Sequence, residues 1–174
     1  KANRTRVATA ILNNNRLDKW QVIFEVAIDK TGSQHFGSRL LWLPDRTLLV
    51  SIGDGGNPPV RLAGDWIRNQ AQNRSSHLGK ILRLNEDGSV PRDNPFVTSA
   101  AADPAVWSYG HRNIQGLAYD SQRSMIWASE HGALGGDELN RIQAGQNYGW
   151  PAATFSREYV GGFKISPHTS KTGM

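Results

Sequence analysis

The feature that most constrains the fold is a pattern that occurs twice along the chain. In each copy, two short apolar segments are joined by a polar turn and followed by a polar loop that contains glycine. The first copy spans residues 39–56 and the second spans residues 116–132. Segments rich in β-branched, aliphatic and aromatic residues indicate strands. Each copy therefore predicts an antiparallel hairpin, and residues 20–28 and 79–84 predict further strands.

Repeated hairpins whose loops emerge on one face are typical of a β-sandwich or a β-propeller. A propeller arranges such loops around a central channel, so the polar residues that end successive hairpins converge on one ligand. This favours an all-β propeller, with Asp54, Arg112 and His131 at or near loops on one face. Residues 65–76 leave room for a turn or two of helix. A closed ring of large blades needs far more than 174 residues, so we expect residues 1–174 to be a partial propeller domain of two to three blades, within a longer protein.

The composition excludes several classes of protein. Hydrophobic residues make up 38% of the chain and charged residues 20%, and no apolar run approaches the ~20 residues of a membrane span. The 20 basic residues outnumber the 15 acidic ones but are scattered, whereas a nucleic-acid site needs a clustered basic stripe. Cysteine is absent, so disulfides, thiolate metal sites and cysteine nucleophiles are excluded. The basic excess is compatible with an anionic ligand.

Polar residues and glycines crowd together between residues 110 and 151. The segments Gly110–Leu117, Ser129–Gly132, Asp137–Asn140 and Asn147–Pro151 contain a guanidinium, imidazoles, amides and carboxylates but few core-forming residues. Glycine lets the backbone approach a ligand closely, and functional groups concentrate on loops. These segments therefore predict the functional site. The Gly53–Gly56 run lacks the lysine and hydroxyl residue of a phosphate-binding loop.

These segments resemble the soluble glucose/sorbosone dehydrogenase family, whose members are aldose dehydrogenases that depend on pyrroloquinoline quinone (PQQ). The matching segments, in chain order, are His35–Arg39, Gly53–Gly56, His77–Asn85, Asp87–Pro91, Asp93–Phe96, Tyr109–Leu117, Ser129–Asn140 and Asn147–Pro151. Each is weak alone, but their order is specific, and together they cover about residues 34–163. The resemblance implies a six-bladed β-propeller. It also implies oxidation of an aldose sugar at its anomeric carbon to a lactone, with PQQ and Ca²⁺ as cofactors and an external electron acceptor, in the periplasm or outside the cell.

The resemblance places the catalytic histidine region near His77, two residues before Gly79. Imidazole titrates near neutral pH and can accept the proton of a sugar hydroxyl. We therefore take His77 as the candidate base, and expect its removal to lower turnover but not quinone binding. The alternative is a histidine that makes a structural hydrogen bond. His111 is more typical of such a structural residue.

Arg112 and Asn113 match the family motif for the quinone. A guanidinium beside a quinone carbonyl stabilises developing negative charge, so Arg112 is assigned both a catalytic and a cofactor-binding role, and the amide of Asn113 can hold another ring substituent. Gly132 and Ala133 resemble the residues that offer backbone carbonyls to a Ca²⁺ that also binds the quinone. The usual proline is Ala133 here.

Asp137 and Glu138 follow the calcium loop closely. They are candidates to steady that loop or to bind the metal directly, because calcium prefers oxygen ligands. The alternative is a solvated acidic turn. For the whole protein, two other functions compete: a non-catalytic propeller that serves as a binding module, and a calcium-dependent propeller lactonase. The presence of the candidate base, the arginine and the calcium loop together in one chain favours the dehydrogenase.

Overall fold

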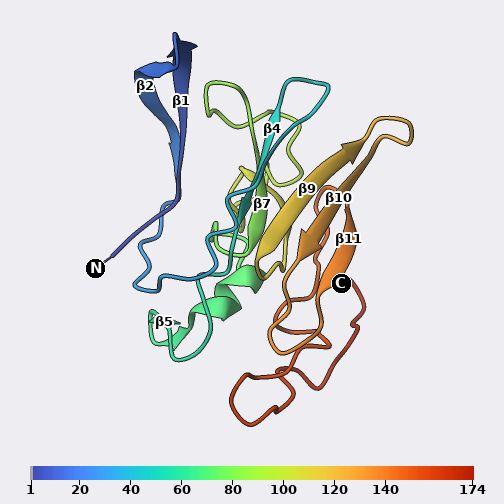
Figure 1. The fold of residues 1–174 in the computed structure, drawn as a ribbon. Coiled ribbons are helices and arrows are strands. Elements are labelled where there is room, and N and C mark those ends of the chain that lie inside the picture. The colour runs from blue at the N-terminus through green and yellow to red at the C-terminus, as the bar shows by residue number, and fades with distance from the viewer. Residues whose placement is uncertain (1) are drawn as a thin grey trace.

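The computed structural model describes residues 2–174, and strands dominate it, with one short 3₁₀ helix (Figure 1). The elements are β1 (Arg6–Asn13), β2 (Arg16–Glu25), β3 (Leu40–Trp42), β4 (Leu48–Ile52), β5 (Arg61–Leu62), β6 (Asp65–Trp66), η1 (Ile67–Gln72), β7 (Lys80–Leu84), β8 (Val106–Tyr109), β9 (Ile114–Asp120), β10 (Met125–Glu130) and β11 (Glu138–Ile142). The helix η1 falls within the segment 65–76 that leaves room for it.

Both hairpins of the repeated pattern form, one in each of two antiparallel sheets. The order β3-β4-β7-β8 makes a four-stranded sheet, and the order β11-β10-β9 makes a three-stranded sheet beside it (Figure 1). Leu41 lies opposite Leu49 in the first hairpin, and Trp127 lies opposite Ala118 in the second. One sheet thus has the four strands expected of a blade, and the other has three within residues 2–174. The expected strand at residues 20–28 runs from Arg16 to Glu25 and pairs with β1.

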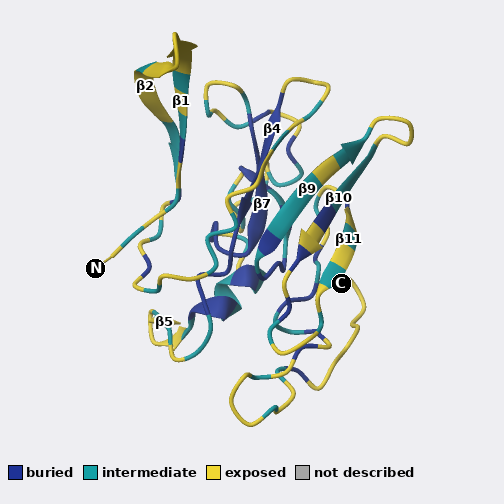
Figure 2. Ribbon diagram, viewed as in Figure 1, coloured by how far each residue is buried: buried dark blue, intermediate teal, exposed yellow. Residues whose placement is uncertain are grey.

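The core lies on both faces of the four-stranded sheet. Side chains alternate between the two faces of a strand, so Leu48, Val50 and Ile52 of β4 pack into one apolar cluster while Leu49 packs into another. The second cluster includes residues of β9, β10 and β11 and joins the two sheets face to face. All five residues of β4 are buried (Figure 2). This packing fixes the relative position of the loops that follow β4, β8 and β10.

A buried lysine fastens η1 to the sheet. The Lys80 ammonium, at the start of β7, donates to the carbonyl oxygens of Gln70 (2.9 Å), Ala71 (2.9 Å) and Leu78 (2.7 Å). Burial lowers the pKa of Lys80 to about 7. The end of η1 is therefore held against the first residues of β7. No helix within residues 2–174 is long and apolar enough to cross a membrane.

Candidate functional site

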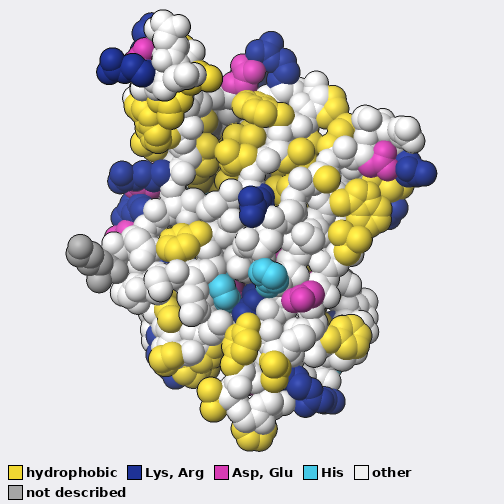
Figure 3. All heavy atoms as spheres, in the orientation of Figure 1, with side chains coloured by type: hydrophobic (Ala, Val, Ile, Leu, Met, Phe, Trp, Pro, Cys, Tyr) yellow, Lys and Arg dark blue, Asp and Glu magenta, His cyan; other side chains and the backbone are white. Residues whose placement is uncertain are grey.

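The loops that follow β4, β8 and β10 meet at one end of the two sheets. The Asp54 backbone N–H donates to the carbonyl oxygen of Arg112 at 2.8 Å. The Arg112 Nη1 in turn donates to the carbonyl oxygen of His131 at 2.9 Å. The three residues expected at one face therefore lie together. In the space-filling view, histidine side chains lie near the middle of the face that is shown, next to acidic and basic side chains (Figure 3).

Arg112 is buried, and within residues 2–174 its guanidinium donates hydrogen bonds only to neutral oxygens. The residue is 2% exposed. Besides His131, it donates to Asn57 Oδ1 at 2.9 Å and lies 3.5 Å from the Tyr159 hydroxyl. Its Nε has no hydrogen-bond partner among residues 2–174. A buried charge without a counter-charge is costly, so an anionic ligand or the carbonyl oxygen of a quinone fits this position.

Asn113 joins a further loop to this cluster. Its Oδ1 accepts a hydrogen bond from the Gly37 backbone N–H at 3.2 Å. The loop before β3, which contains His35, is thereby held beside Arg112. The structure thus brings Arg112 and Asn113 together with a histidine that sequence reasoning did not single out.

His35 has the geometry of an oriented base. Its Nδ1 lies 2.7 Å from Asp54 Oδ1, and its side chain is 10% exposed. Because an ionised carboxylate can only accept hydrogen bonds, we assign the proton to Nδ1, which leaves the lone pair on Nε2. Nε2 lies 3.5 Å from the side-chain nitrogen of Asn57, the residue whose Oδ1 accepts from Arg112. His35 also has a φ of +52°, a backbone conformation that side-chain-bearing residues rarely adopt and that is enriched at functional sites.

The Asp54 carboxylate connects the side chains of this cluster. Asp54 is fully buried, and its carboxylate contacts the His35 imidazole, the Gly56 N–H (3.0 Å) and the Trp150 indole N–H (2.8 Å). The preceding Gly53 permits this arrangement, because a Cβ there would lie 2.1 Å from the carbonyl oxygen of His35. The Gly53–Gly56 run therefore serves the close approach of the His35 loop. Sequence alone offered one signal for His35, its place in the first family-like segment.

His77 lies in a different environment. Its Nδ1 accepts a hydrogen bond from the Ala27 N–H at 3.2 Å, its Nε2 lies 2.9 Å from Asp103 Oδ2, and its ring packs on Phe24. Burial alone would raise the pKa of Asp103, but the hydrogen bond from His77 brings it below its ordinary value. Both ring nitrogens thus face atoms of the protein, Nδ1 the Ala27 N–H and Nε2 the Asp103 carboxylate. The structure does not bring His77 into contact with Arg112 or Asp54. His111 is also buried, stacked on Tyr148 at 4.7 Å.

The expected calcium loop is tightly folded. The Gly132 N–H donates to Asp137 Oδ1 at 2.8 Å, and the Ala133 N–H donates to the Ser156 hydroxyl at 3.1 Å. A Cβ at Gly132 would lie 2.1 Å from the carbonyl oxygen of Gly135. The Asp137 carboxylate thus contacts the backbone of the loop, as the loop-steadying role would require, and its side chain is otherwise largely exposed.

Glu138 lies at the start of β11, opposite Glu130 of β10. Burial raises the pKa of Glu138; a hydrogen bond from Asn140 opposes this rise, and the charge of Glu130 adds to it. Among residues 2–174, no three His, Asp or Glu side chains lie close enough together to hold a metal ion. Calcium takes about six to eight oxygen ligands, so backbone carbonyls of the loop and oxygens of a bound ligand would have to supply most of them.

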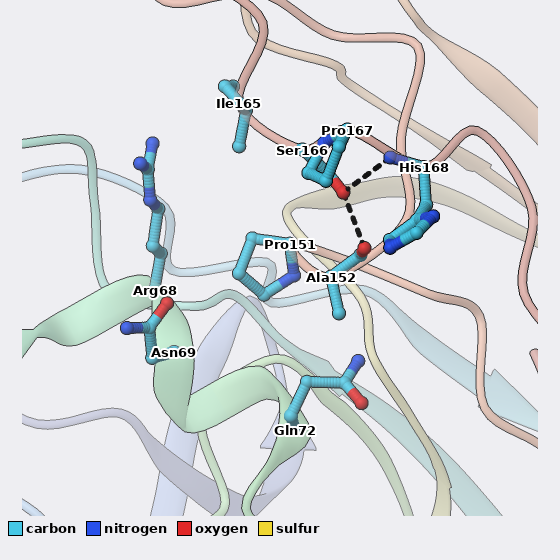
Figure 4. Close-up of a pocket in the computed structure, with 9 residues that line it drawn as sticks. All are labelled: Arg68, Asn69, Gln72, Pro151, Ala152, Ile165, Ser166, Pro167 and His168. Atoms are coloured by element: carbon cyan, nitrogen blue, oxygen red, sulfur yellow. Dashed lines mark hydrogen bonds between the residues drawn. The ribbon is translucent and has the colours of Figure 1, made fainter.

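Beyond Trp150, a pocket borders the site (Figure 4). It has a volume of about 400 Å³ and is lined by Arg68, Asn69 and Gln72 of η1, by Pro151 and Ala152, and by residues 165–168. Arg68 pairs with Glu158 at 2.6 Å, next to Tyr159, which contacts Arg112. The 158–159 segment therefore contacts the guanidinium groups of both Arg68 and Arg112.

Comparison with known proteins identifies relatives of this chain. The family model for glucose/sorbosone dehydrogenases matches residues 1–174. The uncharacterized protein slr1608 of Synechocystis sp. is 65% identical over 173 residues, which cover 99% of this chain and 42% of the relative. The aldose sugar dehydrogenase YliI of Escherichia coli is 36% identical over 151 residues, which cover 87% of this chain and 38% of the relative.

Solved structures agree in fold. A crystal structure of a glucose dehydrogenase superposes with a TM-score of 0.87 at 37% identity, over 97% of this chain and 47% of the other. The PQQ-bound aldose sugar dehydrogenase of Streptomyces coelicolor superposes with a TM-score of 0.71 at 34% identity, over 91% of this chain and 43% of the other. The chain thus spans less than half the length of these relatives. Since the family model matches it from end to end, the chain belongs to the glucose/sorbosone dehydrogenase family.

Proposed function

We propose that the full-length protein containing this chain oxidises aldose sugars at the anomeric carbon to lactones, using PQQ and Ca²⁺. The observation that carries the proposal is the buried Arg112 guanidinium, which has no carboxylate partner among residues 2–174 and shares Asn57 with the His35–Asp54 pair. Oxidation of this kind needs a base for the hydroxyl proton and positive charge where an acceptor oxygen becomes negative. The solved relative in its PQQ-bound form supports the choice of acceptor.

His35 replaces His77 as our candidate base. In the reaction, a hydride leaves C1 of the sugar and a proton leaves its hydroxyl oxygen, so that the C1–O bond becomes the carbonyl of the lactone. His35 Nε2 accepts that proton, and the Asp54 carboxylate at Nδ1 stabilises the imidazolium that forms, as in other His–carboxylate pairs. Bound PQQ supplies the hydride-accepting quinone.

Arg112 and Asn113 are the residues of this chain proposed to hold the quinone. The Arg112 Nε, which has no hydrogen-bond partner in the part of the chain that the structure describes, fits an electron-rich oxygen, and the planar guanidinium presents several donors at once. For calcium we propose the Gly132 and Ala133 carbonyls, with Asp137 holding the loop and Glu138 as a further candidate ligand. The whole protein would be a six-bladed propeller to which residues 1–174 contribute two to three blades. It would act in the periplasm or outside the cell and pass electrons to an external acceptor.

The test uses the full-length protein purified without cofactor. Addition of PQQ and Ca²⁺ should produce aldose-dependent reduction of a redox dye, and chelation of calcium should abolish it. Omission of either cofactor is the control. Activity that requires a nicotinamide cofactor, hydrolysis of a lactone without PQQ, or inactivity with every aldose would contradict the proposal. The last result would indicate the non-catalytic binding module.

A further inference from the structure

Trp150 contacts three side chains in and next to the candidate site, those of Asp54, Arg112 and Arg68. It is 3% exposed, and its indole Nε1 donates to Asp54 Oδ2 at 2.8 Å. The other carboxylate oxygen of Asp54 contacts His35. The carboxylate is therefore held at both ends, by the indole on one side and by the imidazole on the other.

The face of the same indole lies against two buried cations. The guanidinium carbon of Arg112 is 5.4 Å from the ring centroid, and that of Arg68 is 6.0 Å from it. Cations within about 6 Å of an indole face are attracted by its quadrupole, more strongly where water is excluded. One side chain thus sets both the direction of the Asp54 carboxylate and the position of the Arg112 guanidinium.

The backbone of Trp150 is fixed from two directions. Its N–H donates to the carbonyl oxygen of Gly110 at 2.9 Å, and its carbonyl oxygen accepts from Gln72 Nε2 at 2.7 Å. Residues from η1 and from the loop after β8 therefore hold the indole in place. A rigid donor of this kind orients a catalytic group more precisely than a mobile water would.

We propose that Trp150 is a positioning residue: its indole N–H fixes the Asp54 carboxylate, which holds His35 in the tautomer with the proton on Nδ1 and the lone pair on Nε2. The catalytic meaning of this role rests on the proposed function. The coupling between indole, carboxylate and imidazole does not, so it can be tested without cofactor or substrate.

The sequence offers a matched pair of substitutions. Trp150→Phe keeps an aromatic face for the cations but removes the N–H donor. Trp107→Phe removes an indole N–H that has no hydrogen-bond partner among residues 2–174, from a ring that also faces a guanidinium, that of Arg83 at 4.9 Å. The two variants lose the same atoms, and only the first touches Asp54.

The experiment records ¹⁵N spectra of the full-length protein with ¹⁵N-labelled histidine, assigned with the variant His35→Gln. Wild type should show His35 with its proton on Nδ1, slow to exchange. Trp150→Phe should give a mixture of tautomers and at least about tenfold faster exchange of that proton, whereas Trp107→Phe should match wild type. If Trp150→Phe retains the wild-type His35 signals, or if both variants change them equally, the inference is overturned.

A second measurement tests the inference if Trp150→Phe does not fold. In that event, Asp54→Asn should shift the indole proton of Trp150 and leave that of Trp107 unchanged; an unshifted Trp150 proton would overturn the inference. In the loaded enzyme, Trp150→Phe should lower kcat at least tenfold with KM nearly unchanged. If Trp150→Phe loses the His35 tautomer and the wild-type protein is inactive with every aldose, the proposed function is refuted but the positioning role of Trp150 stands.

Discussion

Substitution of Gly53 by alanine should displace the candidate base while leaving every polar group of the site in the sequence. Gly53 has no positive φ, so its backbone conformation is open to alanine. The obstacle is the neighbouring backbone: the added Cβ would lie 2.1 Å from the carbonyl oxygen of His35 and 2.5 Å from its carbonyl carbon. Backbone cannot rotate away as a side chain can.

The size of the effect follows from these distances. The Cβ and the His35 carbonyl oxygen must separate by about 1.3 Å to pass from 2.1 Å to the 3.4 Å at which ordinary contact begins. Misplacement of a catalytic group by ~1 Å can cost about 10²-fold in rate. Overpacking of this kind also costs about 1–3 kcal/mol of folding free energy. We therefore expect Gly53→Ala to fold, with reduced stability and kcat/KM lowered about 100-fold.

The assay measures kcat/KM with an aldose and the free energy of unfolding in the full-length protein. Gly116→Ala is the control, since the one atom closer than ordinary contact to its Cβ would be the Ser129 hydroxyl oxygen, at 2.6 Å, and that group can rotate. The control should lose little of either quantity. Wild-type turnover in Gly53→Ala, or equal losses in the two variants, would refute the assignment of His35 and the role given to Gly53.

Three further predictions concern the remaining site residues. Arg112→Ala should weaken PQQ binding and turnover together and Arg112→Lys should restore only part of each, because an ammonium lacks the planar fork; equal PQQ affinity in wild type and Arg112→Ala would contradict this. His35→Gln should lower turnover about 10²–10⁴-fold with PQQ affinity retained, whereas His77→Gln should lower the melting temperature and leave kcat within a few-fold; the reverse pattern would restore His77 as base. Glu138→Gln should raise the melting temperature at pH 7 but not at pH 4. A carboxyl whose pKa is raised in the folded state stabilises the fold at a pH below its ordinary pKa and loses that contribution as the pH rises through the raised pKa. A melting temperature that the substitution leaves unchanged at both pH values would exclude this effect.

Much of the fold follows from local sequence. The hairpins at β3–β4 and β9–β10 were predictable because short apolar segments and the polar turns around Asp45 and Asp120 specify strands and their reversal within a few residues. The short helix η1 was also predictable, because residues 65–76 leave room for only a turn or two of helix. The three-stranded form of the second sheet was not, because the number of strands that pair depends on segments distant in sequence.

The candidate site divides in the same way. The loops around Asp54, Arg112 and His131 were predictable, because each follows a strand of a repeated pattern and such loops emerge together. The proposal of His35 in place of His77 as base rests on tertiary contacts instead. Both are lone histidines in family-like segments, and each meets a carboxylate that the sequence does not indicate, Asp54 for one and Asp103 for the other.

The sequence by itself determined the two hairpins, their turns, the family and the neighbourhood of the site, because apolar segments, turn residues and motif order are written in contiguous stretches. Only the tertiary structure decided which groups meet. Trp150 and Asp54 are 96 positions apart, and Arg112 and Asn57 are 55 apart. These contacts depend on how the two sheets pack against each other in the apolar cluster that contains Leu49, and on the absence of a side chain at Gly53. Such packing sums many weak contacts over the whole molecule, and no short stretch of sequence contains it.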